Sequence, residues 1–240
     1  MNTVSLTLFR FDSLAARLWV FTQMGVARLA FRRMPDLGFY KLCGSGSGEG
    51  FTPRPNTAVW AILATWPDAA TARRHINTAP VFLRWASKAS ESWTVLLEPT
   101  SARGTWSGVQ PFIATESGAK TGSSESGPIV ALTRATIRPK TFLRFWRRVP
   151  DISAMIGQDP NVIFKIGIGE VPFLHQITFS IWPDAAAMAG FARGNTHHGR
   201  AIGAVRAENW FAEELYARFR ILDNWGTWGG NNPLALQEII

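Results

Sequence analysis

The chain has 240 residues, of which 46% are hydrophobic and 18% are charged. This composition excludes an intrinsically disordered chain, and the length is sufficient for one large domain or two small ones with a substantial core. The net charge of +8 comes from arginines scattered through apolar sequence, which disfavours a nucleic-acid partner and favours anionic lipid or an acidic electron-transfer protein.

The first half of the chain alternates between strand and helix periodicity. The pattern predicts a strand over 3–11, a helix over 13–31, strands over 37–42 and 57–66, a broken helix over 68–90 and a last strand over 92–98. This is the order β-α-β-β-α-β.

The second half repeats that order. It predicts a strand over 129–137, a helix over 139–156, strands over 162–167 and 173–182, helices over 184–205 and a strand over 215–222. The helix that starts at Pro139 has the clearest apolar stripe, and proline is favoured at a first helical position.

Short motifs recur in the two halves. Trp66-Pro67-Asp68-Ala69-Ala70 returns as Trp182-Pro183-Asp184-Ala185-Ala186, and Gly104-Thr105-Trp106 returns as Gly226-Thr227-Trp228. The two pairs are displaced by 182 − 66 = 116 and 226 − 104 = 122 positions, so one structural unit is used twice.

We therefore predict an α+β fold of two tandem ferredoxin-like halves, at 1–115 and 128–240, joined by a Gly/Ser linker over 116–127. Each half has a bare sheet face, and pairing the two faces would close a barrel-like cavity. Eleven Trp and sixteen Phe residues either fill the core or line a site for a large apolar ligand.

Cys43 is the only cysteine, which excludes an intramolecular disulfide and fits a reducing compartment. Arg10, Asp12 and Arg17 interrupt the amino-terminal apolar stretch, so no signal peptide is predicted. Uncharged windows such as 55–67 are shorter than the roughly 18 residues that a spanning helix needs. We expect a cytoplasmic protein whose membrane contact is at most peripheral.

His197 and His198 are candidate metal ligands at the apparent start of a helix. Adjacent helical residues point about 100° apart, so only one of the two can bind a given metal. His198 shares an apolar stripe with Ile202 and Val205, whereas His197 and Arg200 lie off that stripe. His198 is therefore either a core histidine or the neutral imidazole ligand of a haem.

His175 and Cys43 are the alternatives. His175 shares a strand face with Ile177, Phe179 and Ile181, which fits a buried histidine, a haem ligand or a distal hydrogen-bond donor. Cys43 opens a glycine-rich stretch that lacks the endings of phosphate-binding loops, so a strand-to-strand loop is preferred over phosphate binding or thiolate ligation.

Glu213 and Glu214 resemble a catalytic pair, but sequence neighbours do not face one site. We expect ion pairs with Arg206 or Arg218 at a helix-to-strand hinge instead.

Several stretches resemble the spheroidene monooxygenase family, and together they span nearly the whole chain. The most specific are Gly38-Phe39-Tyr40-Lys41-Leu42-Cys43-Gly44-Ser45-Gly46, Ala61-Ile62-Leu63-Ala64-Thr65-Trp66-Pro67-Asp68, Arg103-Gly104-Thr105-Trp106-Ser107-Gly108, Leu132-Thr133-Arg134-Ala135-Thr136-Ile137-Arg138-Pro139 and Glu213-Glu214-Leu215-Tyr216-Ala217-Arg218-Phe219-Arg220.

The resemblance implies a dimeric α/β barrel that uses haem b and O2 to oxidise C-2 of acyclic carotenoids such as spheroidene, with electrons from a ferredoxin-type donor. It implies a protein of a photosynthetic bacterium, in the cytoplasm or peripheral on the inner membrane, and it is compatible with an oligomer.

Haem proteins of this barrel class commonly take an axial histidine from a helix of the second repeat, which favours His198. Arg193 and Arg200 flank it and would pair with the haem propionates. A carotenoid or haem carrier without turnover and a cofactor-independent barrel monooxygenase are the alternatives.

Overall fold

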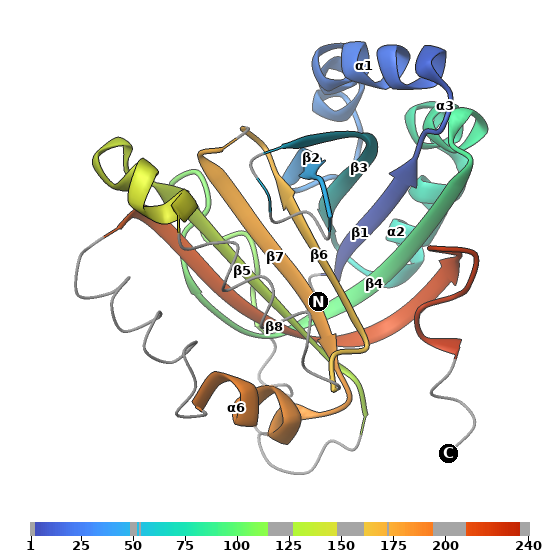
Figure 1. The fold of residues 1–240 in the computed structure, drawn as a ribbon. Helices are drawn as coiled ribbons and strands as arrows, with labels where there is room; N and C mark the ends of the chain where they lie inside the picture. Colours follow the sequence, from blue (N-terminus) through green and yellow to red (C-terminus); the bar gives the residue numbers. More distant parts are fainter. Residues whose placement is uncertain are drawn as a thin grey trace.

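In a computed structural model of the chain, eight antiparallel strands of the described residues close into one barrel (Figure 1). The structure describes residues 3–48, 52, 54–114, 127–147, 161–171, 173–193 and 210–235. The strand order around the barrel is β1-β3-β2-β6-β7-β5-β8-β4.

The bounds of the elements follow the duplicated order. The first half contains β1 (Thr3–Arg10), α1 (Leu14–Arg32), β2 (Tyr40–Gly46), β3 (Pro55–Trp66), α2 (Ala69–Thr78), α3 (Pro80–Lys88) and β4 (Glu91–Gly104). The second contains β5 (Ile129–Ile137), the 3-10 turn η1 (Pro139–Thr141), β6 (Phe164–Gly169), β7 (His175–Trp182), α6 (Ala185–Arg193) and β8 (Phe211–Gly226). The strands run β4-β1-β3-β2 in one half and β8-β5-β7-β6 in the other, which confirms the predicted pair of ferredoxin-like sheets.

The repeated motifs have the same structural role in both halves. Asp68 accepts a hydrogen bond from the Thr71 amide at 2.7 Å and so caps α2, and Asp184 accepts one from the Ala187 amide at 2.7 Å at the start of α6. The duplicated Trp-Pro-Asp-Ala-Ala sequence is therefore a strand end followed by a helix cap.

The long strands β4 and β8 extend well past the predicted 92–98 and 215–222. They pair with each other along most of their length, from Trp93 opposite Gly226 to Gly104 opposite Leu215. This pairing joins the two halves, and short-range periodicity cannot reveal it because the partner strand lies more than a hundred residues away.

The glycine-rich stretch that follows Cys43 was predicted as a loop, but its first residues belong to β2. Gly44 and Ser45 pair with Gly169 and Ile168 of β6, which closes the barrel at the second junction of the two halves. The strand extends here because a partner in the other half satisfies its backbone groups.

Alternation along the strands separates two apolar layers. Inward side chains of both sheets, such as Leu6, Leu63 and Phe179, form a cluster inside the barrel. Outward side chains such as Phe9 pack with Trp85 beneath the helices α1 to α3. The barrel interior is therefore apolar, and a ligand cavity within it stays a prediction.

Some predictions fall on residues that the structure does not describe. The helix predicted over 139–156 is described only to residue 147, and the helices predicted over 184–205 only to residue 193. The predicted linker lies almost entirely outside the described residues, so the domain bounds stay a prediction. Among the described helices, none combines the length and apolar character needed to cross a bilayer.

Candidate functional site

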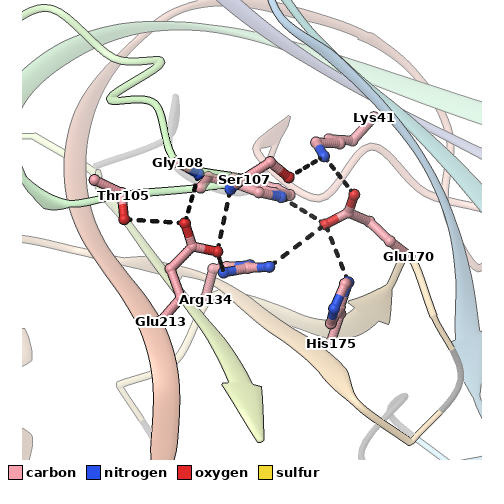
Figure 2. Close-up of polar contacts among 9 residues, drawn as sticks. Lys41, Thr105, Ser107, Gly108, Arg134, Glu170, His175 and Glu213 are labelled. Atoms are coloured by element: carbon pink, nitrogen blue, oxygen red, sulfur yellow. Dashed lines mark hydrogen bonds and ion pairs between the residues drawn. The ribbon is translucent and has the colours of Figure 1, made fainter.

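One end of the barrel interior carries charged side chains, which we call the polar cluster (Figure 2). Its members come from five strands or strand ends and one turn: Lys41 of β2, Trp106 after β4, Arg134 of β5, Glu170 after β6, His175 of β7 and Glu213 of β8. Strand residues two positions apart share a face, so Lys41 points inward like Cys43, Arg134 like Leu132, and Glu213 like Leu215. The polar cluster therefore ends an otherwise apolar interior.

Glu170 is the centre of the polar cluster. Its carboxylate contacts the Lys41 Nζ at 2.6 Å and accepts a hydrogen bond from the Trp106 Nε1 at 2.5 Å. The His175 Nδ1 lies 3.7 Å and an Arg134 guanidinium nitrogen 4.0 Å from the same carboxylate. Three basic side chains thus surround one largely buried carboxylate.

Glu213 holds the turn that follows β4. It accepts hydrogen bonds from the Thr105 Oγ1 at 3.0 Å, the Ser107 amide at 3.1 Å and the Gly108 amide at 2.7 Å, and it forms an ion pair with Arg134. Burial opposes ionisation, but these hydrogen bonds outweigh it and lower the pKa of Glu213 to about 2. Glu213 is therefore a carboxylate at neutral pH.

Arg134 lies between the two carboxylates and is almost completely buried, with 1% of its side chain exposed. Its guanidinium sits 5.8 Å from the centre of the Trp106 ring, and its Nε is a buried donor with no hydrogen bond. Two carboxylates and an aromatic face compensate the desolvation of this cation.

His175 is the one sequence-predicted candidate that belongs to the polar cluster. Burial lowers its pKa, and the positive charges of Arg134 and Lys41 lower it further, although Glu170 and Glu213 act in the opposite direction. Its buried Nδ1 makes no hydrogen bond. The imidazole is therefore neutral near pH 7, which is the form that binds metals.

Cys43 is fully buried on the inward face of β2. Burial and the negative charge of Glu170 raise the pKa of its thiol far above the usual value. The thiol thus stays protonated at neutral pH, which disfavours the thiolate ligation considered from the sequence.

The remaining predicted residues are not placed by the structure. His197, His198 and Arg200 lie outside the described residues, and Arg193 is the last residue of α6, where only the backbone is described. Their roles stay predictions. Within the described ranges, no group of three or more His, Cys, Asp or Glu side chains is arranged to hold a metal ion.

The ion pair of Glu213 or Glu214 that we expected with Arg218 is wrong, and Arg206 lies outside the described residues. Glu213 pairs with Arg134 rather than Arg218, and Glu214 accepts a hydrogen bond from the Tyr216 hydroxyl at 2.7 Å. The segment is also part of β8 and is no hinge. Adjacent strand residues point to opposite faces, so only Glu213 reaches the barrel interior.

Sequence reasoning missed Lys41, Arg134 and Glu170 as members of a site. A usable signal existed for Arg134, since it occupies an inward position of a strand whose other inward residues, Val130 and Leu132, are apolar. A charge at such a position needs buried partners.

Three relatives are named spheroidene monooxygenase. Those of Cereibacter sphaeroides and Rhodobacter capsulatus are each 54% identical to this chain over 98% of its length, and the matches cover 71% and 96% of the relatives. That of Rubrivivax gelatinosus is 34% identical over 90% of this chain and 81% of the relative. No family model matches the chain.

Solved structures of low identity share the fold. An aldoxime dehydratase matches with a TM-score of 0.59 and 10% identity over 92% of this chain and 82% of that chain. The aldoxime dehydratase OxdRE, in complex with butyraldoxime, matches with a TM-score of 0.57 and 8% identity over 92% and 80%. Such identities bear on the barrel fold alone. By its identity to the three relatives over nearly its full length, the chain belongs to the spheroidene monooxygenase family and is a monooxygenase.

Proposed function

We propose that the chain is a haem-dependent monooxygenase that oxidises C-2 of acyclic carotenoids and converts spheroidene into spheroidenone. The observation that carries this proposal is the 54% identity, over almost the whole chain, to two proteins named for that substrate. An apolar barrel interior that ends in the polar cluster agrees with a hydrocarbon substrate and a polar reaction.

The residues of the polar cluster fit a haem group in one respect. A haem iron takes a neutral imidazole, and His175 is neutral, partly buried and oriented with Nδ1 toward Glu170. A carboxylate beside the non-ligating nitrogen is the usual partner of a metal-binding histidine. The protonated Cys43 thiol does not fit as a ligand.

The proposed axial ligand remains His198, with Arg193 and Arg200 as partners of the propionates and His175 as the alternative ligand or a distal group. Each of the two candidate ligands can be tested without the other. Replacing His198 and His175 separately by Ala therefore distinguishes them by the absorption spectrum, before any turnover is measured.

Bound haem would supply the oxidation, in which each hydroxylation takes one O2, two electrons and two protons and releases one water. Two hydroxylations at one carbon give a geminal diol, which loses water to form the ketone. The protein's own part is to hold the terminal carbon in place and to exclude bulk water, which the apolar interior favours. Neutral His175 can hold a proton at Nδ1, which lies 3.7 Å from the Glu170 carboxylate. We propose a ferredoxin-type protein as the electron donor.

The deciding experiment is the visible spectrum of the freshly purified protein with and without dithionite, followed by an assay with spheroidene, O2 and a reductant. A Soret band that shifts on reduction, together with a ketone product, is expected. Turnover without a Soret band would identify a cofactor-independent monooxygenase. A Soret band or bound carotenoid without turnover would identify a carrier.

The ligand variants complete the test. The His198→Ala variant is expected to lose or shift the Soret band, whereas Cys43→Ala is expected to keep it. An unchanged band in His198→Ala would end that assignment, and a lost band in His175→Ala would transfer the ligand role to His175.

A further inference from the structure

The helix α1 exposes an apolar stripe to solvent. Leu14, Leu18, Phe21 and Leu29 are between 58% and 73% exposed. They follow one another at intervals of four, three and eight residues, which places them on one side of an α-helix. Monomeric soluble proteins seldom leave such a contiguous apolar surface uncovered.

This stripe is separate from the face of α1 that holds the fold together. Val20, Ala27 and Phe31 are buried, and they pack over the barrel in the outer core. Figure 1 shows α1 along the outside of the barrel, with one side turned away from the strands. The helix thus has two apolar faces, of which the barrel needs only one.

The charged side chains on the helices α1, α2 and α3 all have one sign. The three helices of the first half contain no Asp or Glu, and they carry Arg17, Arg28, Arg32, Arg73, Arg74, Arg84 and Lys88. Arg28 and Arg32 are exposed near the carboxyl end of the stripe, and Arg33 follows as the exposed C-cap. Arg73 and Arg74 of α2 contact Asp223 and Asp36, so the basic surface beside the stripe belongs to α1 and α3.

From these observations we infer that α1 docks on the surface of an anionic lipid bilayer, with Leu14, Leu18, Phe21 and Leu29 inserted and Arg28, Arg32 and Arg33 at the headgroups. An apolar helix face with basic residues beside it is the arrangement of helices that lie in the membrane interface. A single basic side chain near an anionic leaflet strengthens binding about fivefold.

The charge pattern favours lipid over a second copy of the chain, because two such basic surfaces would repel each other. Lipid docking also explains why an apolar stripe is exposed on α1. The inference goes beyond the proposed function, since it assigns a surface and needs neither haem nor substrate. It agrees with that function, because an acyclic carotenoid is a long, largely apolar polyene that dissolves in bilayers.

The test is co-sedimentation of the full-length protein with vesicles of phosphatidylcholine and phosphatidylglycerol in equal amounts, compared with phosphatidylcholine alone. Strong binding to the anionic vesicles, weakened by salt, is expected. Arg28→Gln/Arg32→Gln should weaken that binding about 25-fold. Leu14→Gln/Leu18→Gln should weaken it about tenfold or more, since glutamine preserves helix propensity but does not insert.

Matched control variants show whether the loss of binding depends on the position of the substituted residues or only on their type. Ile113→Gln/Leu143→Gln removes two similarly exposed apolar side chains elsewhere, and Arg54→Gln/Arg147→Gln removes the same charge elsewhere. Both controls should bind like the unmodified protein. Circular dichroism and the melting temperature verify that every variant is folded.

The inference is overturned if the α1 variants bind vesicles as the controls do, or if neutral and anionic vesicles bind equally. It is also overturned if sedimentation shows a dimer that Leu14→Gln/Leu18→Gln dissociates, because the stripe would then be a contact between copies. Loss of the haem spectrum in His198→Ala should leave vesicle binding unchanged, so failure of the proposed function and failure of this inference remain distinguishable.

Discussion

Glu91 and Glu213 are equivalent residues, each near the start of a long strand and each holding the turn at the end of the other half's long strand. Glu91 accepts a hydrogen bond from the Gly230 amide at 2.7 Å, and Glu213 accepts one from the Gly108 amide at 2.7 Å. Each carboxylate also contacts an arginine, Arg10 at 3.4 Å in one half and Arg134 in the other. The same carboxylate-to-turn interaction therefore occurs twice, and each copy links one half of the chain to the other.

The duplicated interaction differs in burial, and this leads to a prediction. The Arg134 side chain is 1% exposed and the Arg10 side chain 37%. Arg134→Met should lower the free energy of unfolding by about 3–5 kcal/mol, because it leaves buried carboxylates without their cation. Arg10→Met should cost about 1 kcal/mol or less, since its ion pair is more exposed. Urea denaturation measures both, and equal losses would contradict the role assigned to burial.

Gly104 should tolerate no side chain. It has a φ of +98°, and an added Cβ would overlap the Glu214 carbonyl oxygen of the paired strand. Gly104→Ala should therefore destabilise the protein by roughly 3 kcal/mol or more, since backbone strain and a backbone clash combine. Gly108 also has a positive φ, of +77°, but faces open space, so Gly108→Ala should cost only about 1 kcal/mol. Melting temperatures that fall equally would refute this reasoning.

Acid should destabilise the fold partly through Glu213. Its pKa is about 2 in the folded state against an ordinary value of 4.5, so it favours folding at pH values above 4.5, and this contribution is lost as the pH falls toward 2. The contribution is at most about 3 kcal/mol. Glu213→Gln should be less stable at pH 7 and should lose less stability on acidification. Glu214→Gln, on the opposite face of the same strand, is the matched control and should behave like the unmodified protein.

The acidic and the basic side chains around His175 should shift the pKa of its imidazole in opposite directions. The pKa of His175 lies below the ordinary 6.5, chiefly because the imidazole is buried. Removing the Glu170 charge in Glu170→Gln should lower the pKa further, and removing the Lys41 charge in Lys41→Met should raise it. An NMR titration of the imidazole, assigned with His175→Gln, measures these shifts. A pKa that does not respond to either variant would show that the polar cluster does not surround His175 as described.

The sequence alone determined the duplicated β-α-β-β-α-β order and most element starts. Ser13 was expected to begin a helix and is its N-cap, and β5 lies where the alternation predicts it. The repeated Trp-Pro-Asp and Gly-Thr-Trp motifs marked equivalent positions in both halves. These features depend on local sterics, capping and alternation, which act within a few residues and are therefore visible in the sequence.

Only the tertiary structure decided the full lengths of β4 and β8, the strand character of Cys43 to Gly46 and the membership of the polar cluster. Lys41, Glu170 and Glu213 come from three separate strands or strand ends, and barrel closure brings them together. Such contacts depend on strand register across residues far apart in the chain, and no local pattern encodes which distant strand will be the partner.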